Sequence, residues 1–213
     1  MMGMVCYLKS VSPWLFGKIR DNPSIMEAIA SSSFTELPEI SREMLDKMPA
    51  RAAEQVKKSM ELVRSTRRKR LDELRERFGQ EFERIREEME QPPLSLEKEW
   101  HTIHYMLTGG PVTDGSAVGQ AVLGGTEIGG DLGFGPARAL DPGKVAEVSS
   151  ELCRLSRDEF LERFDPESMQ SANIYPGIWD DEYEECACEL FEQLGNYYRE
   201  AADRGKAMLL YIV

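Results

Sequence analysis

Two histidines three residues apart are the first residues in this chain that could carry chemistry. Both lie in the segment "WHTIHYMLTGG", as His101 and His104, and on a helix this spacing places them on neighbouring parts of one face. A helical projection from the apolar residues of the segment puts His104 at the boundary of the core and leaves His101 largely exposed. We expect a boundary histidine that hydrogen-bonds to a loop, and a general base is the alternative.

A zinc or iron ion held by these histidines would need one or two further ligands. The acidic run Asp180, Asp181 and Glu182 could supply them, but only through a tertiary contact that the sequence does not reveal. The four cysteines contain no CxxC pair, and their spacing matches no disulfide scaffold, so reduced thiols are predicted. The sequence therefore predicts no metal site and no cofactor.

A glycine-rich stretch, residues 119–140, invites comparison with phosphate-binding loops. No GK[ST] triplet occurs in the chain, which excludes a P-loop. Arg138 stands where a dinucleotide fingerprint would have its third glycine, and Glu127 and Asp131 place carboxylates where a phosphate needs amides and cations. The stretch therefore predicts turns between short strands, in which Arg138 is the residue suited to an anionic group.

No diagnostic catalytic motif supports the remaining candidates, since neither GxSxG nor HExxH occurs. The catalytic candidates are His104, Arg138 and Asp131. Tyr175 and Trp179 flank a Pro-Gly turn in "NIYPGIWDD", a loop that we expect to cover the core, with a recognition surface as the alternative. The candidates for ligand or partner binding are Trp100, His104, Arg138, Tyr175 and Trp179.

The elements that must position these residues are helices between two terminal strands. Residues 3–11 and the closing "AMLLYIV" have the composition of strands. Helix starts are predicted at Ser12, Asp141 and Ser156. Ser95 is expected to cap the histidine helix, with "AVLGG" and "PARAL" as short extended pieces. Strands at both ends with helices between them predict an α+β domain with a small mixed sheet.

Residues 41–91 form a charged helical segment, with 14 Lys or Arg against 12 Asp or Glu. Apolar residues recur in steps of three and four, with one gap at the basic run "RSTRRKR", residues 64–70. No Gly or Pro lies in this gap, so one long helix is favoured over a hairpin folded there. A narrow apolar stripe on a charged helix predicts a partner helix, with self-association as the simplest form. We expect residues 1–40 and 92–213 to form one domain and residues 41–91 an inserted arm.

The formal net charge of −12 excludes some classes of partner. Residues 41–91 are nearly neutral, so the rest of the chain carries about −14, and such a surface repels nucleic acid and anionic membranes. No stretch approaches 18 consecutive apolar residues, and no basic region precedes the apolar start. The sequence predicts a cytoplasmic protein without a membrane or nucleic-acid partner.

Five segments together resemble a known family. "MGMVCYL", "WHTIHYMLTG", "AVLGG", "NIYPGIW" and "AMLLYIV" follow one another in the chain, and they resemble the YfbM-like family, also called the domain of unknown function DUF1877. The resemblance covers residues 2 to about 40 and 94 to 213. It implies a small bacterial α+β domain with no assigned activity and offers no catalytic residues to carry over. Residues 41–91 look like an insertion relative to shorter members.

Two functional hypotheses follow. The first is a non-enzymatic binding or regulatory protein that acts through protein–protein contacts, in one version an immunity-like protein whose acidic surface masks a basic partner. The arm would then mediate self-association or recruit the partner, and deletion of residues 42–90 is expected to leave a folded monomer. The alternative is a small-molecule or metal-dependent enzyme, which would need His104 and Arg138 to converge with a carboxylate from Glu127, Asp131 or Asp180.

Overall fold

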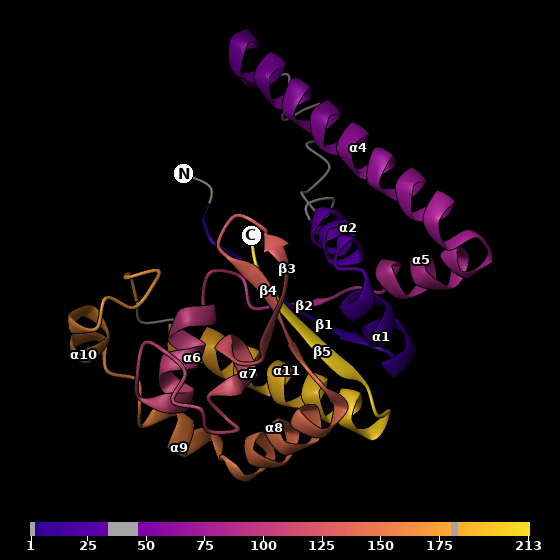
Figure 1. The fold of residues 1–213 in the computed structure, drawn as a ribbon. Coiled ribbons are helices and arrows are strands. Elements are labelled where there is room, and N and C mark those ends of the chain that lie inside the picture. Colours follow the sequence, from indigo (N-terminus) through magenta and orange to yellow (C-terminus); the bar gives the residue numbers. More distant parts are fainter. Residues whose placement is uncertain (1–2, 34–46, 180–182) are drawn as a thin grey trace.

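A five-stranded antiparallel sheet with helices on both faces forms the centre of the molecule (Figure 1). The computed structural model describes residues 3–33, 47–179 and 183–213. The strand order is β2-β1-β5-β4-β3, with the strands at Leu94–Ser95, Cys6–Val11, Ala207–Ile212, Pro136–Leu140 and Thr126–Asp131.

The predicted α+β class is confirmed, and both terminal strands belong to the sheet. They lie at its middle, paired in continuous register from Cys6 opposite Ile212 to Val11 opposite Ala207. The sheet is antiparallel and not mixed as the sequence suggested, because each strand pair of the described residues is antiparallel. β3 and β4 form a hairpin, so they are antiparallel by connection.

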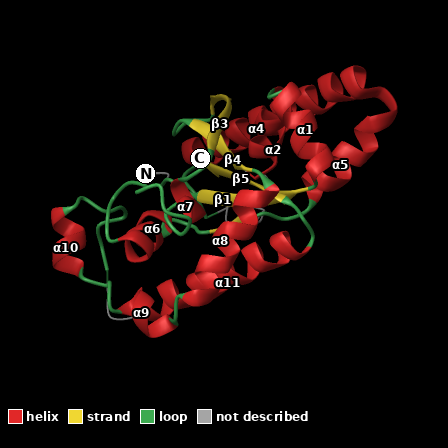
Figure 2. Ribbon diagram, turned by 60° about the horizontal axis from the view of Figure 1, so that its bottom comes forward, coloured by secondary structure: helices red, strands yellow, loops and turns green. Residues whose placement is uncertain are grey.

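Alternation along the central strands divides the interior into two cores. Cys6 and Leu8 point into one core and Val11 into the other, and on β5 Met208 and Leu210 alternate with Leu209 in the same way. We call these the first core and the second core. Figure 2 shows α8 and α11 on one side of the strands and α1, α2 and α5 on the other.

The first core is covered by helices, one of which carries Trp100 and His104. Its longest helix, α11 (Tyr183–Asp203), packs beside α8 (Pro142–Arg154). The shorter helices around it are α6 (Trp100–Thr108), α7 (Gln120–Leu123), α9 (Arg157–Leu161) and α10 (Pro166–Ser171).

The second core is covered by α1 (Pro13–Asp21), α2 (Ser24–Ser33) and α5 (Phe82–Glu90). Phe82, Ile85 and Met89 of α5 are buried in this core. Polar contacts hold the same helix against the start of α1, where Glu88 accepts hydrogen bonds from the Ser12 backbone N–H at 2.9 Å and the Ser12 hydroxyl at 2.8 Å. The end of the predicted arm is therefore part of the packed interior.

The long helix of the arm is α4 (Ala50–Phe78), which passes through the basic run without a break (Figure 1). At 1.5 Å per residue it is about 44 Å long. The chain reverses after it through a short 3-10 turn, Gly79–Glu81, where Gly79 adopts a positive φ of 51°. The predicted absence of a turn at residues 64–70 is confirmed, and the helix ends at Gly79, before the end of the predicted helical segment.

Local capping signals place several helix starts where the sequence predicts them. Ser12 accepts a hydrogen bond from the Leu15 N–H, Asp141 caps α8, and Ser156 forms a capping box with Glu159.

Three local expectations around the glycine-rich region are corrected by the structure. Ser95 lies in β2, and the histidine helix begins at Trp100, because the Leu94–Ser95 segment pairs with β1. Residues of "AVLGG" form the short helix α7, and β3 occupies the next residues, which the sequence left as turns.

Within the described ranges, no helix is long and apolar enough to cross a membrane.

Candidate functional site

Helix α6 brings together most of the residues that the sequence singled out. It presents Trp100, Thr102, Ile103 and His104 as buried side chains at the edge of the first core. The helix ends at Gly109, whose left-handed conformation lets its N–H donate to the Tyr105 carbonyl. The loop that follows returns over the same helix, and the loop around Tyr175 covers its other side.

His101 joins these two loops through both ring nitrogens. Its Nδ1 accepts a hydrogen bond from the Tyr175 backbone N–H at 3.1 Å, and its Nε2 lies 2.9 Å from the Pro111 carbonyl oxygen. Because Nδ1 is an acceptor, the neutral ring carries its proton on Nε2 and donates to Pro111. Burial lowers the pKa of His101, and the Pro111 carbonyl opposes this shift. The loop-bound histidine that the sequence predicts at position 104 is therefore His101.

The aromatic loop packs onto α6 as expected for a cover of the core. The Thr102 hydroxyl donates to the Tyr175 carbonyl at 3.2 Å and accepts from the Trp179 indole N–H at 3.1 Å. The Tyr175 hydroxyl accepts a hydrogen bond from the Met4 N–H at 3.1 Å. The Trp100 ring stacks on His101 with 4.9 Å between centroids and on Tyr175 with 6.1 Å. The aromatic side chains at the contact between the loop and α6 are therefore Trp100, Tyr175 and Trp179.

His104 is completely buried, not at the boundary of the core. Neither of its ring nitrogens makes a hydrogen bond to the described residues. Burial lowers the pKa of His104 below its ordinary value, the Val112 backbone opposes this shift, and smaller effects come from His101 and Asp114. The imidazole is therefore held neutral beneath the loop that follows α6, away from bulk water.

Arg138 lies on the β3–β4 hairpin and is paired with a carboxylate. It stands opposite Glu127 in the strand register, and the two side chains form an ion pair of 3.0 Å with Arg138 at 39% exposure. Asp131 accepts hydrogen bonds from the Gly133 and Gly135 N–H groups, which lower the pKa of Asp131. These two carboxylates therefore serve the hairpin and its turn.

No described hydrogen bond or ion pair joins His104 to the residues of the hairpin. Asp180, the third carboxylate that the enzyme hypothesis considers, lies outside the described residues, as do Asp181 and Glu182. Groups of three or more potential metal ligands are absent from the part of the chain that the structure describes. The residues around α6 can hold loops in place. Among the described residues, no hydrogen bond or ion pair connects His104 with Arg138 as an acid–base pair.

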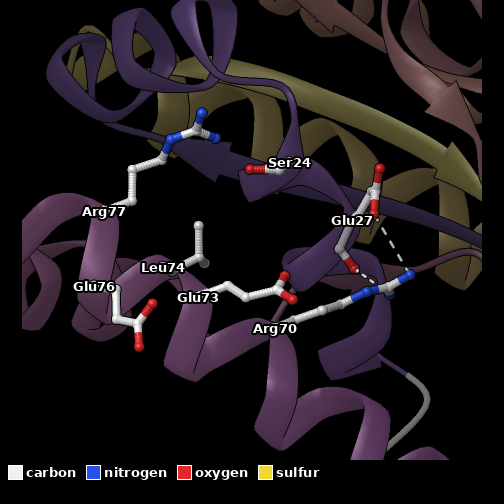
Figure 3. Close-up of a pocket in the computed structure, with 7 residues that line it drawn as sticks. All are labelled: Ser24, Glu27, Arg70, Glu73, Leu74, Glu76 and Arg77. Atoms are coloured by element: carbon white, nitrogen blue, oxygen red, sulfur yellow. Dashed lines mark hydrogen bonds and ion pairs between the residues drawn. The ribbon is translucent and has the colours of Figure 1, made fainter.

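A groove between α2 and α4 is a feature that the sequence did not indicate (Figure 3). Its volume is about 500 Å³. Arg70 reaches across it, donating to the Glu27 carbonyl at 3.0 Å and to the Ser31 hydroxyl, with an ion pair of 3.5 Å to the Glu27 carboxylate. Arg77 donates to the Asn22 amide oxygen at 2.9 Å.

The apolar floor of this groove is formed by Leu74, which is buried between the two arginines on α4. The arginines and this leucine hold the C-terminal half of α4 against α2 and the turn that precedes it. Arg70 belongs to the basic run, and the structure shows that it binds α2.

The N-terminal half of α4 projects beyond α2 (Figure 1). A cationic ridge begins in this half and continues past the middle of the helix. We define this ridge as Lys57, Arg64 and Arg68, which are seven and four residues apart and exposed. These spacings keep all three side chains on one side of the helix. None of the three forms an ion pair with the residues that the structure describes, whereas Lys69 is paired with Glu73 at 3.9 Å.

Comparison with known proteins places the chain in a family without assigned activity. The family model described as domain of unknown function DUF1877 matches residues 2–211. A solved structure of YfbM from Escherichia coli, titled a protein of unknown function, is 25% identical, with a TM-score of 0.45 over 57% of this chain and 83% of that one. No curated protein matches the sequence. Because the family model spans nearly the whole chain, the protein belongs to the DUF1877 family.

Proposed function

We propose that this protein is a non-enzymatic binding protein that engages an acidic protein surface through the exposed half of α4. One observation carries the proposal, namely the separation of charge along the chain. Residues 50–70 contain eight Lys or Arg and two Asp or Glu, a net charge of +6. The remaining residues contain 18 basic and 36 acidic side chains, a net charge of −18. Opposite charges concentrated on separate surfaces favour association between complementary faces.

The division of α4 into two halves supports the proposal. The C-terminal half uses Arg70, Leu74 and Arg77 to pack against α2 and the turn that precedes it. The N-terminal half carries Lys57 and Arg64 of the cationic ridge and, on another side of the helix, Leu62 at 67% exposure. A helix that extends beyond the contacts that fix it costs conformational entropy without adding core, so its exposed surface is the expected place of function.

An acidic protein surface suits the ridge better than nucleic acid does. A duplex is charged along its whole length, so the parts of it that extend from α4 to within about one Debye length of the body, about 8 Å at physiological salt, are repelled by a charge of −18. A protein partner presents its acidic face to the rod alone. Self-association is the first form of this contact to test, because the chain itself carries an acidic surface.

A shortened helix tests the proposed function. Deletion of residues 50–67 removes Lys57 and Arg64 and keeps Arg70, Leu74 and α5, which pack on the body. We expect light scattering to show a concentration-dependent increase in mass for the full chain and a monomer for the shortened chain. An unchanged circular dichroism spectrum per helical residue and a cooperative melt provide the control. A shortened chain that associates as the full chain does would disprove the proposal.

An immunity-like role, in which the acidic body masks a basic partner, is a second version of the binding hypothesis and uses a different surface. It rests on the charge of −18 outside residues 50–70. The two versions differ in which surface the partner contacts, and reversal of charges on α4 affects only the contact through the arm.

The enzymatic alternative stays a prediction with less support. It would need His104 to act beside Arg138, but Arg138 is paired with Glu127, and no described bond connects that pair to His104. Replacing Arg138 and His104 should abolish turnover of any substrate found by screening if this alternative holds.

A further inference from the structure

We infer that the acidic surface that receives the cationic ridge is the outer face of α11 in a second copy of this chain. This inference rests on the proposed function and names the partner surface. The outer face of α11 carries Glu185, Glu189, Glu192 and Glu200, and all four are exposed. Their spacings of four, three and eight residues keep them on one side of the helix, opposite the buried Leu190 and Leu194.

The two charged faces match in spacing along their helices. Arg64 and Arg68 are four residues apart, as are Glu185 and Glu189, which corresponds to about 6 Å of helix. Lys57 and Arg64 are seven residues apart, as are Glu185 and Glu192, or about 10.5 Å. Two arginine or lysine side chains can therefore meet two carboxylates at the same time, whichever direction one helix runs relative to the other.

Neighbouring groups leave the acidic face available. Glu192 forms an ion pair of 3.5 Å with Arg157, in which both side chains are more than half exposed. Glu185, Glu189 and Glu200 form no ion pair with the residues that the structure describes. Arg199 is a basic residue beside this face, and it lies between Glu192 and Glu200 in the sequence. The net charge of the face stays negative.

The receiving α11 must belong to another molecule because of the fold. α11 covers the first core, whereas α4 is attached to α2 on the side of the second core, so the sheet lies between them (Figures 1 and 2). The straight α4 cannot bend around the sheet to reach its own α11. Contact between two different surfaces closes as a dimer when each copy places its α4 on the other, and otherwise extends into a chain.

Because both charged faces are exposed, salt should screen the attraction between them. The Debye length falls from about 10 Å at 0.1 M to about 3 Å at 1 M salt. Exposed ion pairs contribute little individually, so several pairs are needed to hold the two copies. We expect self-association to weaken by roughly tenfold or more over this range of salt.

Charge reversal on each face tests the inference. The first variant is K57E/R64E/R68E and the second is E185K/E189K/E192K. A control, E87K/E162K/E167K, makes the same change in net charge as the second variant at exposed positions outside α11. Circular dichroism and thermal melting show whether each variant is folded. Sedimentation velocity at low ionic strength measures the mass of each variant alone and of the first two mixed.

We expect the wild type and the control to associate, each of the two reversed variants to be monomeric, and their mixture to form a mixed dimer or chain. An α11 variant that associates as the wild type does, beside a monomeric α4 variant, would overturn the role of α11 and leave the proposed function in place. A mixture that stays monomeric also overturns the pairing of these two faces. A wild type that is monomeric throughout would contradict the inference and the self-associating form of the proposed function together.

Discussion

At the scale of single residues, the two histidines of α6 exchange the roles that their spacing suggests. His101 uses both ring nitrogens to connect the Pro111 and Tyr175 backbones, and His104 is buried without a hydrogen bond to the described residues. An unpaired buried imidazole avoids a larger desolvation cost only by remaining neutral. His104 therefore couples the stability of the fold to pH.

Replacement of His104 by leucine should remove this pH dependence. Burial lowers the pKa of folded His104 below the ordinary value of 6.5, so the unfolded chain binds a proton more readily than the folded one. Above about pH 6.5, the titration of His104 does not affect the free energy of unfolding. Below this pH, the free energy of unfolding falls by about 1.4 kcal/mol for each pH unit, until the folded protein also takes up the proton. Chemical denaturation between pH 5 and 8, values chosen around the ordinary histidine pKa, measures it.

His101 provides the internal control for this measurement, because it titrates in both proteins and cancels in the difference. We expect the free energies of unfolding of wild type and His104→Leu to diverge as the pH falls. Parallel pH profiles would show that His104 does not hold a lowered pKa.

At the scale of elements, the glycine-rich hairpin depends on close backbone packing. Gly125 has a φ of +93°, and a Cβ there would lie 2.7 Å from the Ala139 carbonyl oxygen and 2.9 Å from its carbon. Those atoms belong to β4, so they cannot move away as a flexible side chain would. The glycine is required by geometry and not by a bound phosphate.

We expect Gly125→Ala to lower the free energy of unfolding by about 1–3 kcal/mol or more. Gly130, in the strand β3 that follows Gly125, is the matched control, because no atom lies within 4 Å of a Cβ built there and its φ is not in the left-handed region. Gly130→Ala should change stability by less than about 0.5 kcal/mol. Equal effects of the two substitutions in urea denaturation would contradict the role of Gly125.

The arm consists of two parts with different energetic roles. Ile85 of α5 is completely buried in the second core, whereas Leu62 of α4 is 67% exposed. Truncation of a buried isoleucine to alanine costs about 2–5 kcal/mol, and truncation at an exposed position costs little. Deletion of residues 42–90 would expose the second core, which is why the shorter deletion is the better test of the arm.

The Ile85→Ala variant should therefore unfold at a lower denaturant concentration than the wild type. The shift should correspond to a loss of about 2–5 kcal/mol in the free energy of unfolding. Leu62→Ala, compared under the same conditions, should unfold with the wild type within about 0.5 kcal/mol. A negligible effect at Ile85 would mean that α5 is not part of the cooperative core.

At the scale of the whole molecule, one sheet is shared by two cores. β1 and β5 contribute side chains to both faces, so neither core can lose its packing without exposing the strands that the other needs. Trp14 packs against the second core, and Trp100 and Trp179 belong to the first core or pack against it. Tryptophan fluorescence can therefore follow each core separately.

We expect Trp14→Phe and the double variant Trp100→Phe with Trp179→Phe to report single transitions. In each variant, the fluorescence midpoint should coincide with the midpoint of helical circular dichroism of the same protein, since the sheet couples the two faces. Separate midpoints for fluorescence and circular dichroism in either variant would show that the faces unfold independently.

The sequence by itself determined the features that depend on a few neighbouring residues. The caps at Ser12, Asp141 and Ser156, the strand at each end, and the helix through the basic run all follow from local hydrogen bonds and periodicity. The α+β class follows from the order of these elements. Such features require no knowledge of what lies on the other side of a helix or strand.

Only the tertiary structure decided which surfaces meet. Contacts between residues that are distant in the sequence or on different elements determine three features of the site and the arm. These are the burial of His104, the pairing of Arg138 with Glu127, and the attachment of α4 through Arg70. A helical projection fixes an angle about one axis, but burial depends on the loops that later cover that side. For the same reason the sequence contains both the cationic ridge and the acidic face of α11, and the fold alone places the sheet between them.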